Sequence, residues 1–131
     1  MDGAINPASL PEPSGYSYAY RSEGEFVVHF AGHTAMQDDG SIAASDDLVA
    51  QVKRVLANLK LTAHAAQVNV EDFSKLTIYV TDVEAYKRAS AEIGEAYRAV
   101  FGHHFPAITL VEVSRLWDPQ ALVEIDGVAV V

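Results

Sequence analysis

Cysteine is absent from this chain of 131 residues, and basic residues are scarce. Without cysteine the chain has no disulfide framework, no thiol nucleophile and no cysteine-ligated zinc site. Nine Lys and Arg stand against eighteen Asp and Glu, which gives a formal net charge of −9 with histidine neutral. Because binding to nucleic-acid phosphates needs clustered Lys and Arg, this charge argues against nucleic acid as a partner.

Long hydrophobic runs are also missing. The chain has no run of about 18 apolar residues, so the sequence predicts no transmembrane helix and no membrane partner. The first residues, MDGAINPASLPEPSG, lack both the basic start and the apolar run of a secretory signal peptide. These absences favour a cytoplasmic location.

Length and proline distribution predict one domain preceded by an arm. A chain of 131 residues is typical of a single domain and buries enough surface to fold without a metal or a disulfide. Pro7, Pro11 and Pro13 disfavour a helix near the N-terminus. We therefore expect residues 1–15 to form an extended arm and residues 16–131 to form a single domain.

Hydrophobic periodicity predicts strands and helices in the order ββαβαββ. Alternating tyrosines in residues 16–20 indicate a first strand, and the turn at Glu23 and Gly24 predicts that it forms a β-hairpin with the next strand. Apolar residues at three- and four-residue spacing after the expected N-cap Ser45 indicate the first helix. The expected strands are 16–22, 25–31, 75–81, 107–113 and 121–130, and the expected helices are 46–65 and 83–101.

This order predicts an α+β fold with a mixed sheet. Two long helices between strands are crossover connections, and both are expected to cover one face of the sheet. The strands carry apolar residues on both sides, so the uncovered face is expected to be apolar. An exposed apolar sheet face predicts self-association.

The sequence motifs resemble those of the Rid family, also called the YjgF or reactive-intermediate deaminase family. The most specific are His104-Phe-Pro-Ala107 leading into a strand, VEVSRL at 111–116 and ALVEIDGVA at 121–129. Gly32 after the second strand and VEDFSKLTIYVTD at 70–82 support the resemblance, which covers nearly the whole chain.

The resemblance implies a chorismate-mutase-like α+β fold. It also implies a homotrimer whose three sheets form a central β-barrel, with a small-molecule pocket in each cleft between subunits. The best-known activity of the family is hydrolysis of imines and enamines, such as 2-aminoacrylate, to a keto acid and ammonia. No metal or organic cofactor is needed, and some members are described as ribonucleases.

The family's site residues fall on specific positions of this sequence, and three polar ones are replaced by apolar residues. The residue before Gly32, often Ser in the deaminases, is Ala31. The resemblance places the pocket tyrosine at Tyr18 and the carboxylate of the last strand at Glu124. The arginine that holds the substrate carboxylate normally follows Phe-Pro-Ala, where this chain has Ile108. A helix position that is often Asn is Ala91. The expected substrate-binding residues are Ile108, Ala31, Gly32, His29, Ala91 and Ala107.

Glu124, His33 and Tyr18 are the candidate catalytic residues. Glu124 is the expected acid–base group, because hydrolysis needs a carboxyl group to activate water and transfer protons. His33, just after Gly32, is expected to contact the ligand. His29 is either a core or interface histidine or a base near Glu124.

No other residue clearly replaces the missing arginine. Arg21 and Arg115 are expected to point away from the pocket, and His103 and His104 to stabilise a helix C-terminus. The five histidines do not predict a metal site.

The sequence therefore predicts a divergent Rid-family protein whose partners are a small molecule and its own copies. The first hypothesis is a cofactor-independent hydrolase of an imine or enamine, in the cleft between subunits. Ile108 argues against standard 2-aminoacrylate deaminase activity, because losing a buried bidentate clamp costs about 2–5 kcal/mol of binding. The alternative is a trimer that binds or senses a small ligand without catalysis. Ribonuclease activity is a third hypothesis, which the negative charge opposes.

Overall fold

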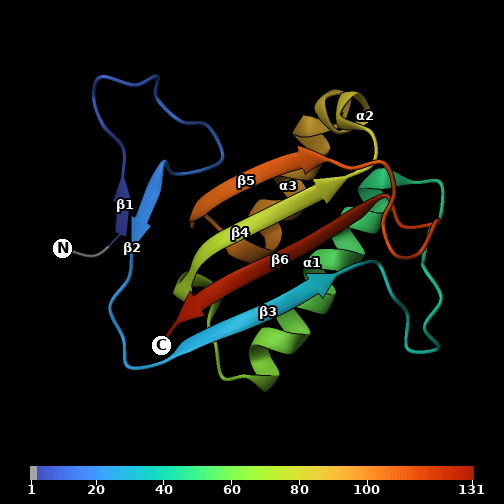
Figure 1. Ribbon diagram of the computed structural model, residues 1–131, viewed down its shortest axis with the longest axis horizontal. Coiled ribbons are helices and arrows are strands. Elements are labelled where there is room, and N and C mark those ends of the chain that lie inside the picture. The colour runs from blue at the N-terminus through green and yellow to red at the C-terminus, as the bar shows by residue number, and fades with distance from the viewer. Residues whose placement is uncertain (1–2) are drawn as a thin grey trace.

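The computed structural model describes residues 3–131 and shows an α+β fold built on a mixed four-stranded sheet. The strand order is β3-β6-β4-β5, with β4 and β5 parallel and the other pairs antiparallel (Figure 1). Its strands are β3 (Val27–His33), β4 (Phe73–Val80), β5 (Ala107–Glu112) and β6 (Val123–Val130). Short strands β1 (Gly3–Ile5) and β2 (Ala19–Arg21) form a separate antiparallel pair.

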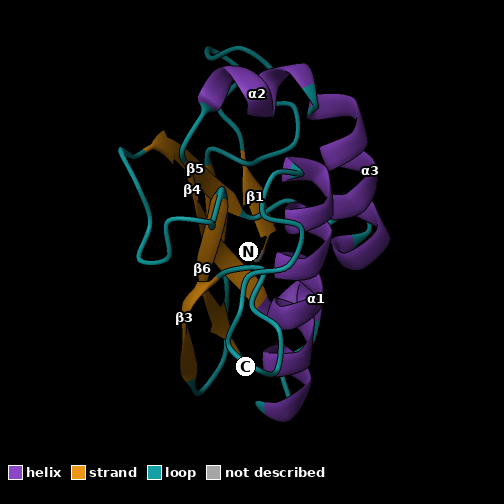
Figure 2. Ribbon diagram, turned by 90° about the vertical axis from the view of Figure 1, so that its right-hand side faces the viewer, coloured by secondary structure: helices purple, strands orange, loops and turns teal. Residues whose placement is uncertain are grey.

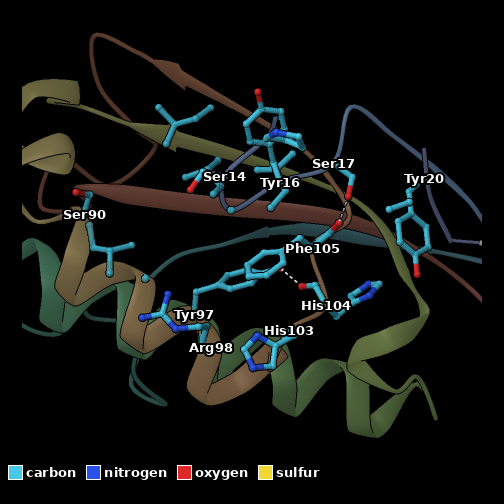
Figure 3. A pocket seen from close by; sticks show the side chains of 18 of the residues that line it. Ser14, Tyr16, Ser17, Tyr20, Ser90, Tyr97, Arg98, His103, His104 and Phe105 are labelled. Carbon is cyan, nitrogen blue, oxygen red and sulfur yellow. Dashed lines mark hydrogen bonds between the residues drawn. The ribbon is translucent and has the colours of Figure 1, made fainter. Parts of the chain in front are cut away.

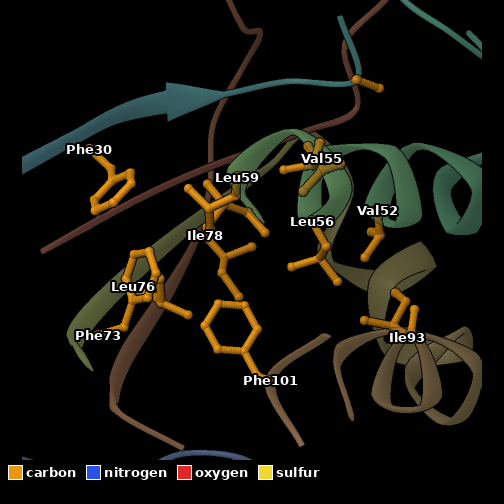
Figure 4. Close-up of a cluster of buried hydrophobic side chains, with 14 of the residues drawn as sticks. Phe30, Val52, Val55, Leu56, Leu59, Phe73, Leu76, Ile78, Ile93 and Phe101 are labelled. Atoms are coloured by element: carbon orange, nitrogen blue, oxygen red, sulfur yellow. The ribbon is translucent and has the colours of Figure 1, made fainter. Parts of the chain in front are cut away.

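Two long helices cover one face of the sheet, as the sequence predicts (Figure 2). They are α1 (Leu48–Ala65) and α3 (Ser90–Phe101), and a 3₁₀ turn η1 (Val70–Asp72) leads from α1 into β4. Alternate residues of β4 and β6 are buried against these helices, which is the expected pattern for a sheet covered on one side. The core includes Phe30, Val52, Leu56, Leu59, Phe73, Leu76, Ile78, Ile93 and Phe101 (Figure 4).

Helix α1 begins two residues later than the sequence indicates, because Asp47 and not Ser45 is its N-cap. The Asp47 carboxylate accepts a hydrogen bond from the Ala50 amide at 3.1 Å. One turn into the helix, the fully buried Gln51 joins α1 to the loop before β6. Its Nε2 donates to the Gln120 carbonyl at 2.9 Å, and its Oε1 accepts from the Leu122 amide at 2.8 Å.

The predicted second helix is divided at Ala89 into α2 (Val83–Arg88) and α3. The backbone of Ala89 has φ −95° and ψ 10°, outside regular helical geometry. Helix α2 buries no residue, whereas α3 buries Ile93, Ala96 and Phe101 against the sheet. The break therefore lets α2 cross the end of the sheet while α3 lies along it (Figure 2).

The predicted hairpin between residues 16–22 and 25–31 is wrong. Strand β2 pairs with β1, and β3 pairs with β6. The expected turn is held by the end of β6, because the amides of Glu25 and Phe26 both donate to the Val131 carbonyl at 2.8 Å. A Cβ at Gly24 would lie 2.7 Å from that carbonyl oxygen, so the segment packs against Val131 and does not form a two-residue turn.

The sheet face away from the helices is only partly apolar, which corrects the expectation of an apolar surface. Positions that alternate with buried ones place the side chains of Thr77, Tyr79, Glu124 and Asp126 on this open face. Val27, His29, Ala31, Val111 and Val128 add apolar and weakly polar surface. No helix described over residues 3–131 combines the length and hydrophobicity needed to cross a membrane.

Candidate functional site

A cavity of about 1590 Å³ lies on the helix side of the sheet, between β5, α3 and the N-terminal segment (Figure 3). Ile108 and Leu110 of β5 form one part of its wall. Helix α3 contributes residues along one side of its length, and the segment from Ala4 to Tyr20 closes over the opening. The cavity is thus formed by parts of the chain that are far apart in sequence.

The N-terminal segment is fixed over this cavity by Ser17, which is buried. The Ser17 hydroxyl donates to the Phe105 carbonyl at 2.6 Å, and its amide donates to the Pro106 carbonyl at 3.0 Å. Tyr20 adds an edge-to-face contact with the His104 ring, with centroids 5.1 Å apart. The segment therefore docks at the beginning of β5.

Aromatic rings line the inner wall of the cavity. The Tyr97 ring stacks on Phe101 with centroids 4.8 Å apart and on Phe105 with centroids 5.4 Å apart. Its hydroxyl donates to the His104 carbonyl at 2.6 Å (Figure 3). Burial is the main cause that raises the pKa of Tyr97 well above its ordinary value, so this hydroxyl stays protonated at neutral pH.

Two of the six expected substrate-binding residues line the cavity, whereas Ala107 and the catalytic candidate Tyr18 do not. Ile108 and Ala91 both contribute to its wall. Ala107 instead pairs with Lys75 of β4 and forms an isolated parallel bridge with Ser17. The Tyr18 hydroxyl donates to the Pro11 carbonyl at 2.8 Å, which holds this side chain against the N-terminal segment.

Arg98 is a cavity residue that sequence reasoning missed. It lies seven residues after Ala91, so the two side chains share one side of α3, about 10 Å apart along the axis. Of the described lining residues, Arg98 is the single lysine or arginine. The seven-residue spacing on a predicted helix is a signal that would have found it.

Glu124 lies outside this cavity, on the open face of the sheet, directly over Gly32. A Cβ at Gly32 would meet the Glu124 Oε1 and Cδ at 2.7 Å. The register of β3 on β6 shifts by one residue between Phe30 and His33, which brings the backbone of Ala31 and Gly32 to this place. The expected neighbours Ala31, Gly32 and Glu124 therefore do come together.

Tyr79 and Asp126 accompany Glu124 and were not predicted. Tyr79 pairs with Glu124 across β4 and β6, and its hydroxyl donates to Asp126 Oδ2 at 3.1 Å. This hydrogen bond is the largest of the causes that raise the pKa of Tyr79, and the nearby charges of Asp126 and Glu124 act in the same direction. The open face thus holds two carboxylates and a protonated phenol close together.

The two histidines of β3 lie on different sides of the sheet. His33 pairs with the buried Ile125, and its ring nitrogens contact the Ala31 carbonyl at 2.7 Å and the Thr62 hydroxyl at 2.8 Å. His33 is thus turned toward α1, whereas Glu124 is on the other face. His29 is exposed, pairs with Val128 and shares the open face with Glu124. Residues 3–131 contain no cluster of three side chains arranged to bind a metal ion.

The candidate residues therefore fall into two groups on opposite faces of one sheet. Ile108 pairs with the buried Leu76 and shares its helix-covered face. Glu124 pairs with Tyr79 on the open face. A ligand that contacts both groups cannot do so within one chain.

Comparison with known proteins gives consistent matches over the chain. The protein-family model described as Endoribonuclease L-PSP matches residues 8–131. A RutC family protein of Pyrococcus horikoshii is 32% identical over 130 residues, covering 98% of each chain. A 2-iminobutanoate/2-iminopropanoate deaminase of Salmonella typhimurium is 35% identical over 91 residues, covering 67% of each.

A solved structure has the same fold over nearly the full length. The Rid-family protein YyfB of Yersinia pestis, a protein of unknown function, superposes with a TM-score of 0.87 at 30% identity. The match covers 98% of this chain and 97% of the other.

Proposed function

Because the chain belongs to the Endoribonuclease L-PSP family, also known as the Rid or YjgF family, we propose that it hydrolyses a small imine or enamine with Glu124 as the acid–base group. The observation that carries this proposal is the position of the Glu124 carboxylate over the bare backbone of Gly32. A substrate or water molecule near Gly32 is within reach of this carboxylate. The named activity of the Salmonella relative supports the reaction class.

The hydrolysis balances with water as the single co-substrate. The Glu124 carboxylate accepts a proton from water as the water oxygen forms a bond to the imine carbon, and the carboxyl group passes this proton to the nitrogen, which gives a carbinolamine. The carboxylate then accepts the hydroxyl proton of the carbinolamine and passes it to the same nitrogen. Ammonia leaves as the C–N bond breaks and the carbonyl forms, and Glu124 is again a carboxylate. An enamine enters the same route after protonation at carbon.

The active site is proposed to lie between subunits of a homotrimer. Ile108 with Ala91, and Glu124 with Gly32, are on opposite faces of one sheet, so two chains are needed to bring both groups to one ligand. His29 shares the open face with Glu124 and is a residue that can orient substrate there. Within one chain, His33 contacts Thr62 and Tyr18 contacts Pro11. They therefore remain candidate catalytic residues only if the assembly of subunits brings them to the ligand.

The substrate is proposed not to be 2-aminoacrylate. The family resemblance puts the carboxylate-binding arginine where this chain has Ile108, whose side chain presents hydrocarbon to the cavity. The proposed substrate is therefore one whose binding does not depend on an arginine at position 108.

A panel of imines and enamines, generated in solution and followed by ammonia release, tests the proposal. We expect Glu124→Ala and Glu124→Gln to remove turnover of any active substrate, while Glu95→Gln, an exposed acid on α3, leaves it unchanged. Unchanged turnover in both Glu124 variants would exclude this mechanism.

Binding without catalysis is the second candidate function. The large, mostly apolar cavity around Ile108 favours it, because a cavity can hold a ligand without the carboxylate of the open face. Stabilisation of the chain by a ligand, with no product formed, would select this alternative. Ribonuclease activity is not proposed, because the chain carries a net charge of −9.

A further inference from the structure

Trp117, the one tryptophan of the chain, lies on the loop that joins β5 to β6. Its side chain is 93% exposed, more than any other large apolar residue that the structure describes. Indole is among the largest apolar side chains and is favoured at interfaces, because burial removes much of its surface from water. A single exposed apolar residue needs no explanation by itself, so the position of Trp117 decides what it does.

The backbone around Trp117 is held in place from both sides. The Arg115 guanidinium donates from Nε to the Leu116 carbonyl at 3.1 Å and from Nη2 to the Trp117 carbonyl at 3.0 Å. Leu116 is buried, and the Asp118 carboxylate accepts a hydrogen bond from the Gln120 amide at 2.8 Å. A partner that contacts the indole therefore has little loop backbone to order, which lowers the cost of binding.

The loop extends from the end of the sheet that carries Glu124. The Thr81 amide, just after β4, donates to the Leu122 carbonyl at 3.2 Å, and Leu122 is two residues before Glu124. Figure 2 shows the loop between β5 and β6 projecting from the sheet on the side away from α1 and α3. Trp117 and Glu124 are therefore presented by the same side of the chain.

The cavity around Ile108 is open where a second chain would approach it. Ala91 lines this cavity and is itself exposed, so the cavity reaches the surface of the chain at α3. Trp117 is not among the residues that line the cavity of its own chain. If Glu124 of one chain faces the cavity of another, the loop that carries Trp117 approaches the same opening.

From this placement we propose that Trp117 of one chain packs against the open side of the neighbouring chain's cavity, near Ala91 of that chain, and forms an aromatic wall of the shared site. The inference rests on the proposed function for the shared site. It deepens that function by naming a residue that comes from the same chain as Glu124 and contacts the apolar part of the substrate. The indole also helps to exclude water from the reacting groups.

The fluorescence of the unaltered chain tests whether a second copy covers Trp117. Residues 3–131 of one chain leave the indole exposed, so protection from the quencher acrylamide indicates contact with another chain. We expect acrylamide to quench the assembled chain several-fold less than N-acetyltryptophanamide, and the emission to lie at shorter wavelength. Quenching equal to that of the free amide, in a sample that light scattering shows to be assembled, would overturn the proposal.

Cysteine crosslinking tests where the loop lies. The chain has no cysteine, so an introduced pair reacts without background. We expect the pair Trp117→Cys and Ala91→Cys to form linked dimers and trimers with a short bis-maleimide. The control pair Trp117→Cys and Leu61→Cys, whose second position is exposed on α1 outside the cavity, should stay unlinked. No linked chains from an assembled first pair would also overturn the proposal.

Kinetics separate a substrate contact from a purely structural role. With any active imine, Trp117→Ala should raise KM by about tenfold, while Trp117→Phe retains most of the affinity because it keeps an aromatic ring. Leu61→Ala should behave like the unchanged chain. An unchanged KM in assembled Trp117→Ala would exclude contact with the substrate.

These outcomes are distinguishable from failure of the proposed function. Glu124-dependent turnover by an assembled chain with a fully quenched indole would reject the role of Trp117 alone. A shielded and crosslinked Trp117 position, with turnover insensitive to Glu124 substitution, would reject the catalytic role of Glu124 alone. A chain that stays monomeric at all concentrations would reject both the shared site and the contact of Trp117.

Discussion

The hydroxyl of Tyr79 donates a 3.1 Å hydrogen bond to Asp126 across strands β4 and β6, next to the carboxylate of Glu124. The pKa of Tyr79 is raised in the fold above its ordinary value of 10.0. Below pH 10 the phenol is protonated in both folded and unfolded chains, so its contribution to stability is fully present. As the pH rises from 10 through the folded-state pKa, the unfolded chain ionises first and this contribution is lost.

We therefore predict that the unfolding free energy falls more steeply above pH 10 in the unchanged chain than in Tyr79→Phe. Urea unfolding at a series of alkaline pH values measures the difference. Tyr18→Phe is the comparison, since the raised pKa of Tyr18 arises mainly from Tyr16 and involves no carboxylate. Identical alkaline slopes for the unchanged chain and Tyr79→Phe would show that the contact with Asp126 has no energetic effect.

Gln51 should be one of the most sensitive positions for folding. Gln51→Leu leaves the amide of Leu122 and the carbonyl of Gln120 without their buried partner, and unsatisfied groups of this kind cost about 1–3 kcal/mol each. We expect a loss of about 2–4 kcal/mol in urea unfolding. Gln120→Leu, which removes an exposed amide side chain from the connected loop, should change stability by less than about 0.5 kcal/mol.

Gly94→Ala should stabilise the fold. Alanine is favoured over glycine inside a helix by about 1 kcal/mol, and the new methyl group contacts only the flexible end of Arg98. We therefore expect the melting temperature in thermal unfolding to rise. An unchanged or lower melting temperature would show that moving the Arg98 side chain costs as much as the helix gains.

Gly32→Ala should reduce turnover by about tenfold or more with little change in stability. The added Cβ occupies the place of Glu124 Oε1, so the carboxylate must move, and misplacement by about 1 Å can cost a hundredfold in rate. Steady-state kinetics and thermal unfolding of the same sample separate the two effects. Full activity in this variant would contradict a reacting carboxylate at that place.

The open sheet face should govern assembly. Val128→Arg places a charge beside His29 in the middle of this face, and we expect it to lower the mass measured by light scattering from that of the proposed trimer to that of a monomer. Leu61→Arg introduces the same residue at an exposed apolar site on α1 and should leave the mass unchanged. A trimer that persists in Val128→Arg would assign assembly to another surface.

Sequence periodicity predicted the parts of the fold in which a local pattern decides the structure. The stripe of Val52, Val55, Leu56 and Leu59 is buried as expected, and the alternation in β6 places Glu124 opposite Val123 and Ile125. The same alternation in β4 places Tyr79 on the open face of the sheet. Its hydrogen bond with Asp126 depends on the register of β4 against β6, which no local pattern specifies.

The errors came from long-range contacts. The segment before β3 is held by Val131, more than a hundred residues away, and this contact takes the place of the expected hairpin. Likewise, the docking of the N-terminal segment depends on Ser17 meeting the carbonyls of Phe105 and Pro106. Arg98 was overlooked because it is an exposed charged residue on a helix, and its place beside the cavity depends on how α3 and the N-terminal segment pack.

Strand β6 lies between β3 and β4, yet it is the last sheet strand to be synthesised. During translation, β3 has no strand neighbour and α1 lacks its contacts with β6 until residues 123–130 leave the ribosome. The nascent chain must therefore keep an unpaired edge and exposed apolar side chains for most of its synthesis. Its folding is thus a late event, and truncation before β6 should produce a chain that depends on chaperones or is degraded.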